Sequence, residues 1–123
     1  MDKYQAPSSR EELESRYANG ERYFPECDLS ELDLSGITLD GASFEIHSWF
    51  SDCNFENASL RGVSFRECNV KCANFKNANL SGASFEGAAI ESAEFHGANI
   101  EGVKVIGATS YGYTLVAGDE LVQ

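Results

Sequence analysis

The sequence repeats every five residues from Cys27 to about residue 107. The repeat is clearest in the units CNFEN, ASLRG, ANFKN, ANLSG, ASFEG and ANIEG, in which the first residue is small or apolar and the third is bulky and apolar. A period of five fits neither the 3.6-residue turn of a helix nor the two-residue alternation of a long strand. Each unit is therefore predicted to be a short extended step followed by a turn, with its first and third side chains facing the core.

Glycine marks the turns of this repeat. The sequence holds 11 glycines, and eight of them occupy the fifth position of a unit, namely Gly36, Gly41, Gly62, Gly82, Gly87, Gly97, Gly102 and Gly107. A type II turn requires a positive φ, which glycine adopts at little cost. The chain is therefore predicted to turn a corner every five residues.

The third positions of the units predict how many corners make one coil. Like side chains recur every fourth unit: one group is Leu39, Leu60, Leu80 and Ile100, and the two flanking groups are Phe24, Phe44, Phe65, Phe85, Val105 and Leu34, Phe55, Phe75, Phe95. The recurrence is 20 residues, with a single 21-residue step that places one extra residue within Ile46–Phe50 (IHSWF). We therefore predict an all-β parallel solenoid with four faces per coil and about four coils, stacked roughly 4.8 Å apart.

The N-terminal end of such a solenoid needs a cover, because an open coil exposes its core and its strand edges. Residues 9–12 (SREE) have the spacing of a helix capping box, and Gly20 is a suitable helix end. A short capping helix is predicted over about residues 9–19, with Leu13 and Tyr17 facing the first coil.

The C-terminal residues do not continue the repeat. We divide the chain into an N-terminal segment with its capping helix (1–21), the repeats (22–110) and a C-terminal cap or tail (111–123). The tail residues that are too bulky for another regular coil, and that are predicted to form a lid or a dimer contact, are Tyr111, Tyr113, Leu115 and Val116.

The units over residues 22–110, together with the leader YANGERYFPECDL, resemble the pentapeptide-repeat proteins, a family abundant in bacteria and especially in cyanobacteria. The resemblance implies a right-handed quadrilateral β-helix. It implies little about activity, because most members of this size have no assigned role. Some larger members inhibit or protect DNA gyrase by imitating the negative charge of a DNA duplex.

The charge of the chain limits its partners. Twenty acidic and nine basic residues give a net charge of −11, so a basic surface for direct binding to nucleic acid or to anionic lipid is not expected. No apolar run is long enough to span a membrane and no signal segment is evident, so we expect a cytoplasmic protein. Residues 34–110 hold nine acidic and five basic residues, a mixture that argues against one continuous acidic ridge.

Several polar side chains are predicted to stack between neighbouring coils. Opposite charges fall above one another in the column Glu45, Arg66, Glu86 and in the pairs Asp40 with Arg61, Glu56 with Lys76, and Lys71 with Glu91. Asparagines do the same in the pairs Asn54 with Asn74 and Asn79 with Asn99, where side-chain amides are expected to hydrogen-bond along the stack.

No catalytic, cofactor-binding or metal-binding constellation is evident. The repeat places Cys27, Cys53 and Cys68 inward and Cys72 outward, which favours buried thiols over a disulfide or a zinc site. The two histidines fall on different coils, and no nucleophile or pair of inward carboxylates accompanies them. We therefore expect a protein that is not an enzyme and needs no cofactor.

The extra residue in IHSWF is the one break in the pattern. Phe50 continues the core, which turns Trp49 toward the surface beside Ile46 and His47. Bulges can re-aim side chains, and tryptophan is favoured in binding hot spots. Another interpretation is that Trp49 lies flat over a widened corner.

The predicted function is a rigid surface that binds an unidentified protein partner, with the acidic gyrase-binding DNA mimic as the alternative. The chain is expected to be a monomer or a dimer through its C-terminal end. The candidate partner-binding residues are Ile46, His47, Trp49, Tyr111 and Tyr113.

Overall fold

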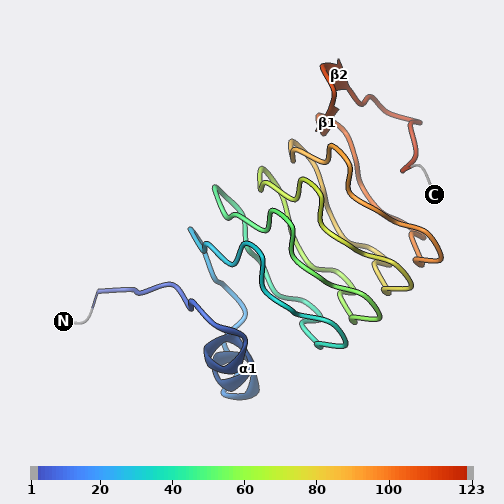
Figure 1. Cartoon of the computed structure of the whole chain (residues 1–123). Helices are drawn as coiled ribbons and strands as arrows, with labels where there is room; N and C mark the ends of the chain where they lie inside the picture. Colours follow the sequence, from blue (N-terminus) through green and yellow to red (C-terminus); the bar gives the residue numbers. More distant parts are fainter. Residues whose placement is uncertain (1–2, 122–123) are drawn as a thin grey trace.

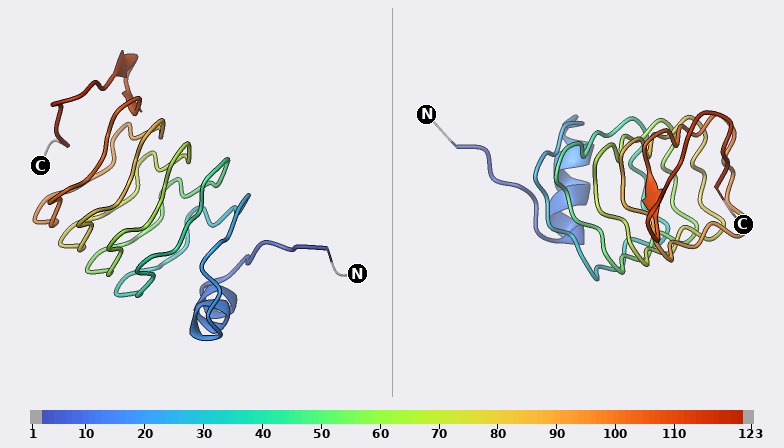
Figure 2. Two further views of the ribbon diagram at one scale, coloured as in Figure 1. Left: turned by 180° about the vertical axis from the view of Figure 1, so that it is seen from behind. Right: turned by 90° about the horizontal axis from the view of Figure 1, so that it is seen from above.

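The computed structural model describes residues 3–121 and shows a stack of similar coils along one axis (Figure 1). Helix α1 (Arg10–Ala18) lies at the N-terminal end of the stack, and a small antiparallel pair, β1 (Thr109–Ser110) and β2 (Tyr113–Thr114), lies at the C-terminal end. The two further views in Figure 2 show the coils one behind another, with α1 against the first.

Successive coils are joined by isolated parallel β-bridges that recur every five residues. Bridge partners are 20 residues apart, as in Asn54 with Asn74, except where the pair spans the corner at 45–48, as in Asp33 with Asn54. One ladder runs from Tyr23 through Ser43, Ser64 and Ser84 to Lys104, which makes four steps from coil to coil. The predicted 20-residue coil and its single 21-residue step are confirmed.

The corners form as the glycine pattern predicts. The fifth residue of each regular unit has a positive φ, 71° at Gly82 and 61° at Cys72, whereas in the six-residue corner the positive φ falls on His47. The carbonyl of the third residue accepts a hydrogen bond from the first N–H of the next unit, as Val70 does from Ala73 at 3.1 Å. Glycine is the least costly residue in this left-handed conformation, which explains its place in the repeat.

The asparagines at second positions do not bond along the stack as predicted. Each side-chain oxygen instead accepts from the backbone N–H two residues ahead, as Asn74 Oδ1 does from Lys76 at 2.9 Å. The same bond forms at Asn54, Asn79 and Asn99. Asparagine and aspartate favour this local Asx turn, so the side chain stabilises its own corner and not the neighbouring coil.

The core consists largely of two phenylalanine ladders on opposite sides of the coil. Phe55, Phe75 and Phe95 stack with ring centroids 5.1 and 5.3 Å apart and nearly parallel planes. Phe24, Phe44, Phe65 and Phe85 form the second ladder. The two ladders meet edge to face in the middle, for example at 5.7 Å between Phe65 and Phe75. Offset stacks and edge-to-face contacts are the favourable aromatic geometries.

The predicted N-terminal capping helix is confirmed. Ser9 is the N-cap of α1, and its Oγ accepts from the Glu12 N–H at 3.1 Å. Leu13 is fully buried against the first coil, and the Tyr17 hydroxyl donates to the Asp40 carbonyl at 2.8 Å. The helix therefore both covers the core and satisfies part of the exposed edge.

The C-terminal lid is smaller than the sequence predicts. Of the four residues assigned to it, only Leu115 is buried, while Tyr111, Tyr113 and Val116 are exposed. Leu121 provides the second buried side chain. The tight β1–β2 turn holds Tyr111 at its tip and Tyr113 in β2, so their rings point away from the core.

Phe75→Ala should strongly destabilise the protein. The ring is fully buried between Phe55 and Phe95, so its loss leaves a cavity in the middle of the stack. We expect the free energy of unfolding to fall by about 3–5 kcal/mol in urea titrations followed by circular dichroism. Tyr23→Ala removes an aromatic ring from the surface and is expected to change it by less than about 1 kcal/mol; equal effects of the two substitutions would contradict this account of the core.

Candidate functional site

The inserted residue widens one corner of the second coil, between Phe44 and Ser48. Ser48 takes the inward first position and is buried, and its Oγ accepts a hydrogen bond from the Cys27 N–H at 3.0 Å. Phe50 returns to the core and is fully buried. Trp49, between them, points outward with half of its surface exposed, as the sequence predicts.

Trp49 belongs to a ladder whose other members have small or short side chains. We call this side the Trp49 face: its bridge residues are Asp28, Trp49, Asn69, Ala89 and Thr109. Beside the indole lies a shallow hollow of about 180 Å³, which Asn69 and Ala89 line together with His47, Glu67 and Gly87 at the corner. The hollow exists because the residues that follow Trp49 on this ladder, Asn69 and Ala89, have much smaller side chains.

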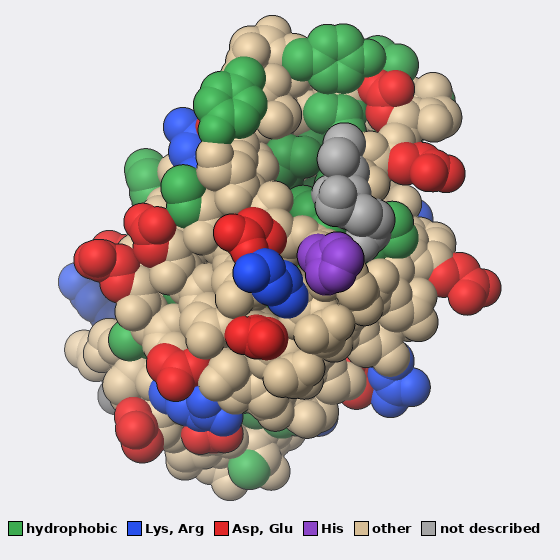
Figure 3. Space-filling view, turned by 45° about the vertical axis from the view of Figure 1, so that its right-hand side comes forward, with side chains coloured by type: hydrophobic (Ala, Val, Ile, Leu, Met, Phe, Trp, Pro, Cys, Tyr) green, Lys and Arg blue, Asp and Glu red, His purple; other side chains and the backbone are tan. Residues whose placement is uncertain are grey.

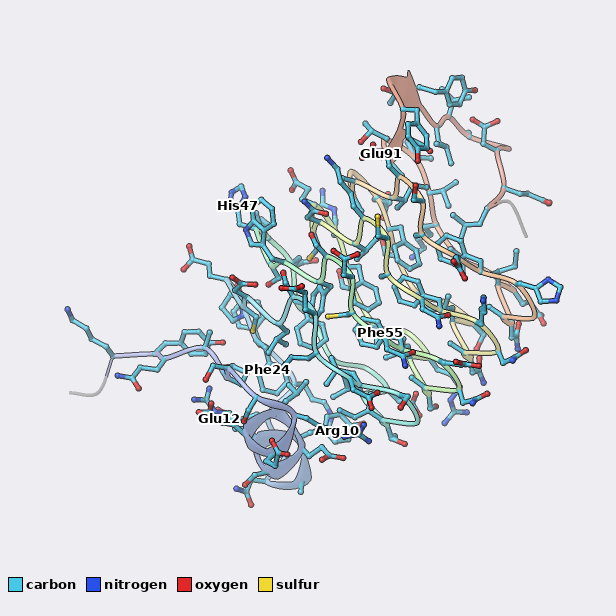
Figure 4. All side chains as sticks on the ribbon, in the orientation of Figure 1. Arg10, Glu12, Phe24, His47, Phe55 and Glu91 are labelled. Atoms are coloured by element: carbon cyan, nitrogen blue, oxygen red, sulfur yellow. The ribbon has the colours of Figure 1, made fainter. Side chains whose placement is uncertain are left out.

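The structure brings together three of the five predicted partner-binding residues. Ile46 and His47 are exposed in the widened corner next to Trp49. In Figure 4, His47 projects from the upper side of the ribbon, and Glu91 lies on that side nearer the C-terminal end.

The other two predicted residues form a separate patch. Tyr111 follows Thr109, which is three coils from Trp49 on the same ladder, or about 14 Å at the spacing of neighbouring strands. Tyr111 and Tyr113 are 77% and 56% exposed. The Tyr111 hydroxyl contacts Ser92 Oγ, and the Tyr113 hydroxyl donates to Asp119 Oδ2 at 3.0 Å.

Two of the predicted charge stacks form ion pairs, while Arg66 forms none with Glu45 or Glu86 in the described part of the chain. Arg61 contacts Asp40 at 3.0 Å, and Lys71 contacts Glu91 at 3.2 Å. Lys76 does not pair with Glu56; its Nζ lies 2.9 Å from Glu94 in the following coil, and this hydrogen bond raises the pKa of Lys76. The prediction compares only the fourth positions of neighbouring coils. The long side chain of Lys76 instead reaches Glu94, which is at a second position.

Three thiols are buried, as predicted, and the fourth is exposed. Cys27, Cys53 and Cys68 face the core, whereas Cys72 sits at an outward corner, and all four are free. Burial raises the pKa of the Cys27 thiol to about 11 and those of Cys53 and Cys68 to about 12. These neutral thiols serve as small core side chains and not as nucleophiles.

Residues 3–121 contain no group of three or more histidine, cysteine, aspartate or glutamate side chains that could hold a metal ion. Within the same part of the chain, no helix is long and apolar enough to cross a membrane.

Sequence reasoning missed two surface features. Tyr23 is as exposed as the tail tyrosines, because it stands at an outward second position of the first coil. Two further hollows lie at the C-terminal end, where residues 118–121 cross the last coil. The sequence signal for these hollows is the small number of bulky residues that follow the repeats.

A family model described as a pentapeptide repeat region matches residues 21–95 and 46–109. The chain belongs to the pentapeptide repeat family. The match covers the bridged coils described above and extends over the widened corner. The comparison with curated proteins gives no match.

Solved structures of the family have the same fold. The pentapeptide repeat protein alr5209 from Nostoc PCC 7120 is 22% identical, with a TM-score of 0.71 over 87% of this chain and 99% of that one. Rfr23 from Cyanothece 51142 is 26% identical, with a TM-score of 0.67 over 72% of this chain, which spans only 60% of the length of Rfr23.

A third similar structure is QnrB1, a plasmid-mediated fluoroquinolone resistance protein. It is 22% identical, with a TM-score of 0.58 over 70% of this chain and 62% of that one. Together these relatives imply a right-handed β-helix for the repeats.

The buried thiols should make stability depend on pH above about 8.5. An unfolded thiol loses its proton near that pH, whereas Cys68 keeps its proton in the folded state until its pKa of about 12 is reached. Rising pH therefore favours the unfolded state. Between pH 8.5 and 10, the free energy of unfolding of Cys68→Ala should fall by about 1.5 kcal/mol less than that of the wild type, in urea titrations with reductant present.

The matched control is Cys72→Ala, which removes the exposed thiol. Its stability is expected to fall with pH as the wild type does. A Cys68→Ala variant that also followed the wild type would show that burial of this thiol does not contribute to the pH dependence.

Proposed function

We propose that this protein is a non-enzymatic binding module, which presents the Trp49 face of a rigid β-helix to a protein partner. The observation that supports the proposal is the half-exposed Trp49 indole beside a hollow on an otherwise small-residue ladder. The site comprises Ile46, His47 and Trp49, with Tyr111 and Tyr113 as a second contact farther along the same side.

The backbone that carries Trp49 is fixed before any partner binds. The Trp49 N–H donates to the Cys27 carbonyl at 2.8 Å, and its own carbonyl accepts from the Leu29 N–H at 2.8 Å. The Phe50 N–H donates to the Asn69 carbonyl at 2.7 Å. Preorganised aromatic side chains lose little entropy on binding, and tryptophan is enriched among residues that dominate interface energies.

The surroundings of the indole favour a particular partner surface. The hollow is too shallow for a metabolite to be enclosed, but it can accept one protruding apolar side chain against the Trp49 ring. The carboxylate of Glu67 stands at its margin, and the chain as a whole carries a net charge of −11. We infer that the partner offers an apolar side chain flanked by basic residues.

The same proposal includes the finer organisation of the molecule. Residues 22–110 form a right-handed quadrilateral β-helix of about four coils, between an N-terminal cap (1–21) and a C-terminal cap (111–123). The 20-residue bridge register and the family relatives support this description. A reducing cytoplasm suits the three buried thiols.

Trp49→Ala should abolish partner binding without unfolding the protein. Immobilised wild-type protein, Trp49→Ala and Tyr23→Ala are compared for the proteins that they capture from an extract of the source organism. Tyr23→Ala is the matched control, because it also removes an exposed aromatic ring, but from the first coil and not from the Trp49 face. A protein captured by the wild type and by Tyr23→Ala, but not by Trp49→Ala, is the expected result.

The captured protein is then purified and titrated into the wild type. Trp49 is the single tryptophan of the chain, so its emission reports directly on the site. We expect a shift to shorter wavelength as the partner covers the indole. A partner that binds Trp49→Ala as tightly as the wild type would contradict the proposed site.

The alternative, an acidic mimic of DNA that binds gyrase, predicts a continuous negative surface. The repeats instead intersperse basic residues among the acidic ones, and three of the nine carboxylates over residues 34–110 form ion pairs with them, namely those of Asp40, Glu91 and Glu94. We therefore expect no effect on gyrase supercoiling at a large molar excess of this protein. Inhibition of supercoiling would favour the alternative over a module that acts through Trp49.

A further inference from the structure

The last coil leaves a row of backbone donors open. In the coil below, the N–H groups of Leu80, Gly82 and Phe85 each donate to a carbonyl of the next coil at 2.8 Å. One coil further, the equivalent donors have no hydrogen-bond acceptor among residues 3–121. These donors are the N–H groups of Ile100, Gly102 and Val105.

Backbone acceptors are open along the same edge. The Ala78 carbonyl accepts from Asn99 at 2.9 Å, and the Ala83 carbonyl accepts from Lys104 at 3.0 Å. The equivalent carbonyls one coil further are those of Ala98 and Val103, which accept no hydrogen bond from the described part of the chain. Donors and acceptors thus alternate as they do for an incoming parallel strand.

The C-terminal tail completes only a neighbouring side of this coil. Leu115 donates to the Ala108 carbonyl and accepts from the Gly107 N–H, both at 2.8 Å, so the chain pairs with itself there. Over residues 100–105 the tail stands away from the edge. The space between them is a hollow of about 510 Å³, which residues 118–121 line on the other side.

The hollow has an apolar floor and an acidic margin. Ile100, Val103 and Val105 contribute apolar surface, while Glu101, Asp119 and Glu120 contribute carboxylates. The described residues that line the hollow include no lysine or arginine, and the one basic residue of this stretch of the edge is the exposed Lys104, outside the hollow. Figure 3 shows hydrophobic side chains gathered at this end of the molecule, with acidic side chains beside them.

We propose that this end groove, lined by residues 100–103, 105 and 118–121, binds an extended basic peptide that adds to the open edge as the start of a further coil. The peptide backbone pairs with the donors and acceptors of the edge, and an apolar side chain enters the hollow. Its alternate, outward residues are lysine or arginine, which face Glu101 and Glu120. A second copy of this chain fits poorly, because it would bring the same carboxylates against these.

A synthetic ten-residue peptide tests the groove directly. It consists of the unit Ala-Lys-Leu-Lys-Gly twice, so that small and bulky side chains match the inward positions of a coil. Binding is followed by amide NMR spectra and hydrogen exchange of the full chain. We expect shifts and slower exchange at the Ile100, Gly102 and Val105 amides, with one peptide bound per protein.

Two control peptides separate backbone pairing from charge. In the first, backbone N-methyl-lysine replaces the first lysine of each unit, which removes the N–H groups that would donate to Ala98 and Val103 and keeps the charge; we expect at least about tenfold weaker binding. In the second, glutamate replaces every lysine, and binding should be lost. Equal binding of the N-methylated peptide would overturn strand addition.

Protein variants locate the charge effect. Glu101→Lys with Glu120→Lys should weaken binding about tenfold at low salt. Glu26→Lys with Glu31→Lys makes the same charge change on exposed corners of the first coil and should have little effect. Equal weakening by both double variants would show that only general electrostatic attraction holds the peptide, and would overturn the assigned groove.

Two further results distinguish the occupants and the sites. Concentration-dependent shifts of the Ile100, Gly102 and Val105 amides without peptide would show that a second copy takes the edge, which overturns the proposal. Trp49→Ala should bind the peptide like the wild type, because the groove is separate from the Trp49 face. Loss of peptide binding in Trp49→Ala would overturn that separation.

Discussion

Everything in this fold depends on the parallel backbone ladder between successive coils. Each side of a coil makes only a single bridge to the next, so no strand is long enough to be stable by itself. The ladder fixes the distance between coils, and that distance places the rings of Phe55, Phe75 and Phe95 in contact. Backbone pairing and aromatic stacking therefore have the same period, and neither can change without the other.

This shared period explains why a single inserted residue has a confined effect. An extra residue within one side would reverse the inward and outward positions of everything after it. Here it falls in a corner, where the chain is already free of bridge partners, and Ser48 resumes the inward position. The Ser48 hydroxyl at this inward position is not left without a partner, because its Oγ accepts from the Cys27 N–H of the first coil at 3.0 Å. The bulge therefore alters the surface around Trp49 and leaves the core columns unbroken.

The sequence predicts those features that the repeat itself encodes. The coil length, the core columns, the positive φ at fifth positions and the capping helix all follow from periodicity or from a local motif. Predictions of side-chain partners are less successful. Asn74 bonds to its own corner and Lys76 reaches Glu94, because several partners lie within reach of a flexible polar side chain and the repeat does not rank them.

The tail shows a second limit of prediction from sequence. Tyr111, Tyr113 and Val116 have the size expected of a lid, but their placement depends on the β1–β2 turn, which reverses the chain and turns them outward. Only Leu115 and Leu121 reach the core. Nothing in the five-residue pattern specifies where the coil stops, since each coil is built to receive another.

The two ends of the stack differ in how the terminal coil is covered. At the N-terminal end, α1 brings a buried Leu13 and side chains that bond to first-coil carbonyls, such as Tyr17 to Asp40. At the other end, the tail closes one side and leaves the edge over 100–105 with open donors and acceptors. A repeat that ends without a complete cap retains its capacity to pair with another strand. The acidic margin then restricts which strands are acceptable, because an unrestricted edge would promote aggregation.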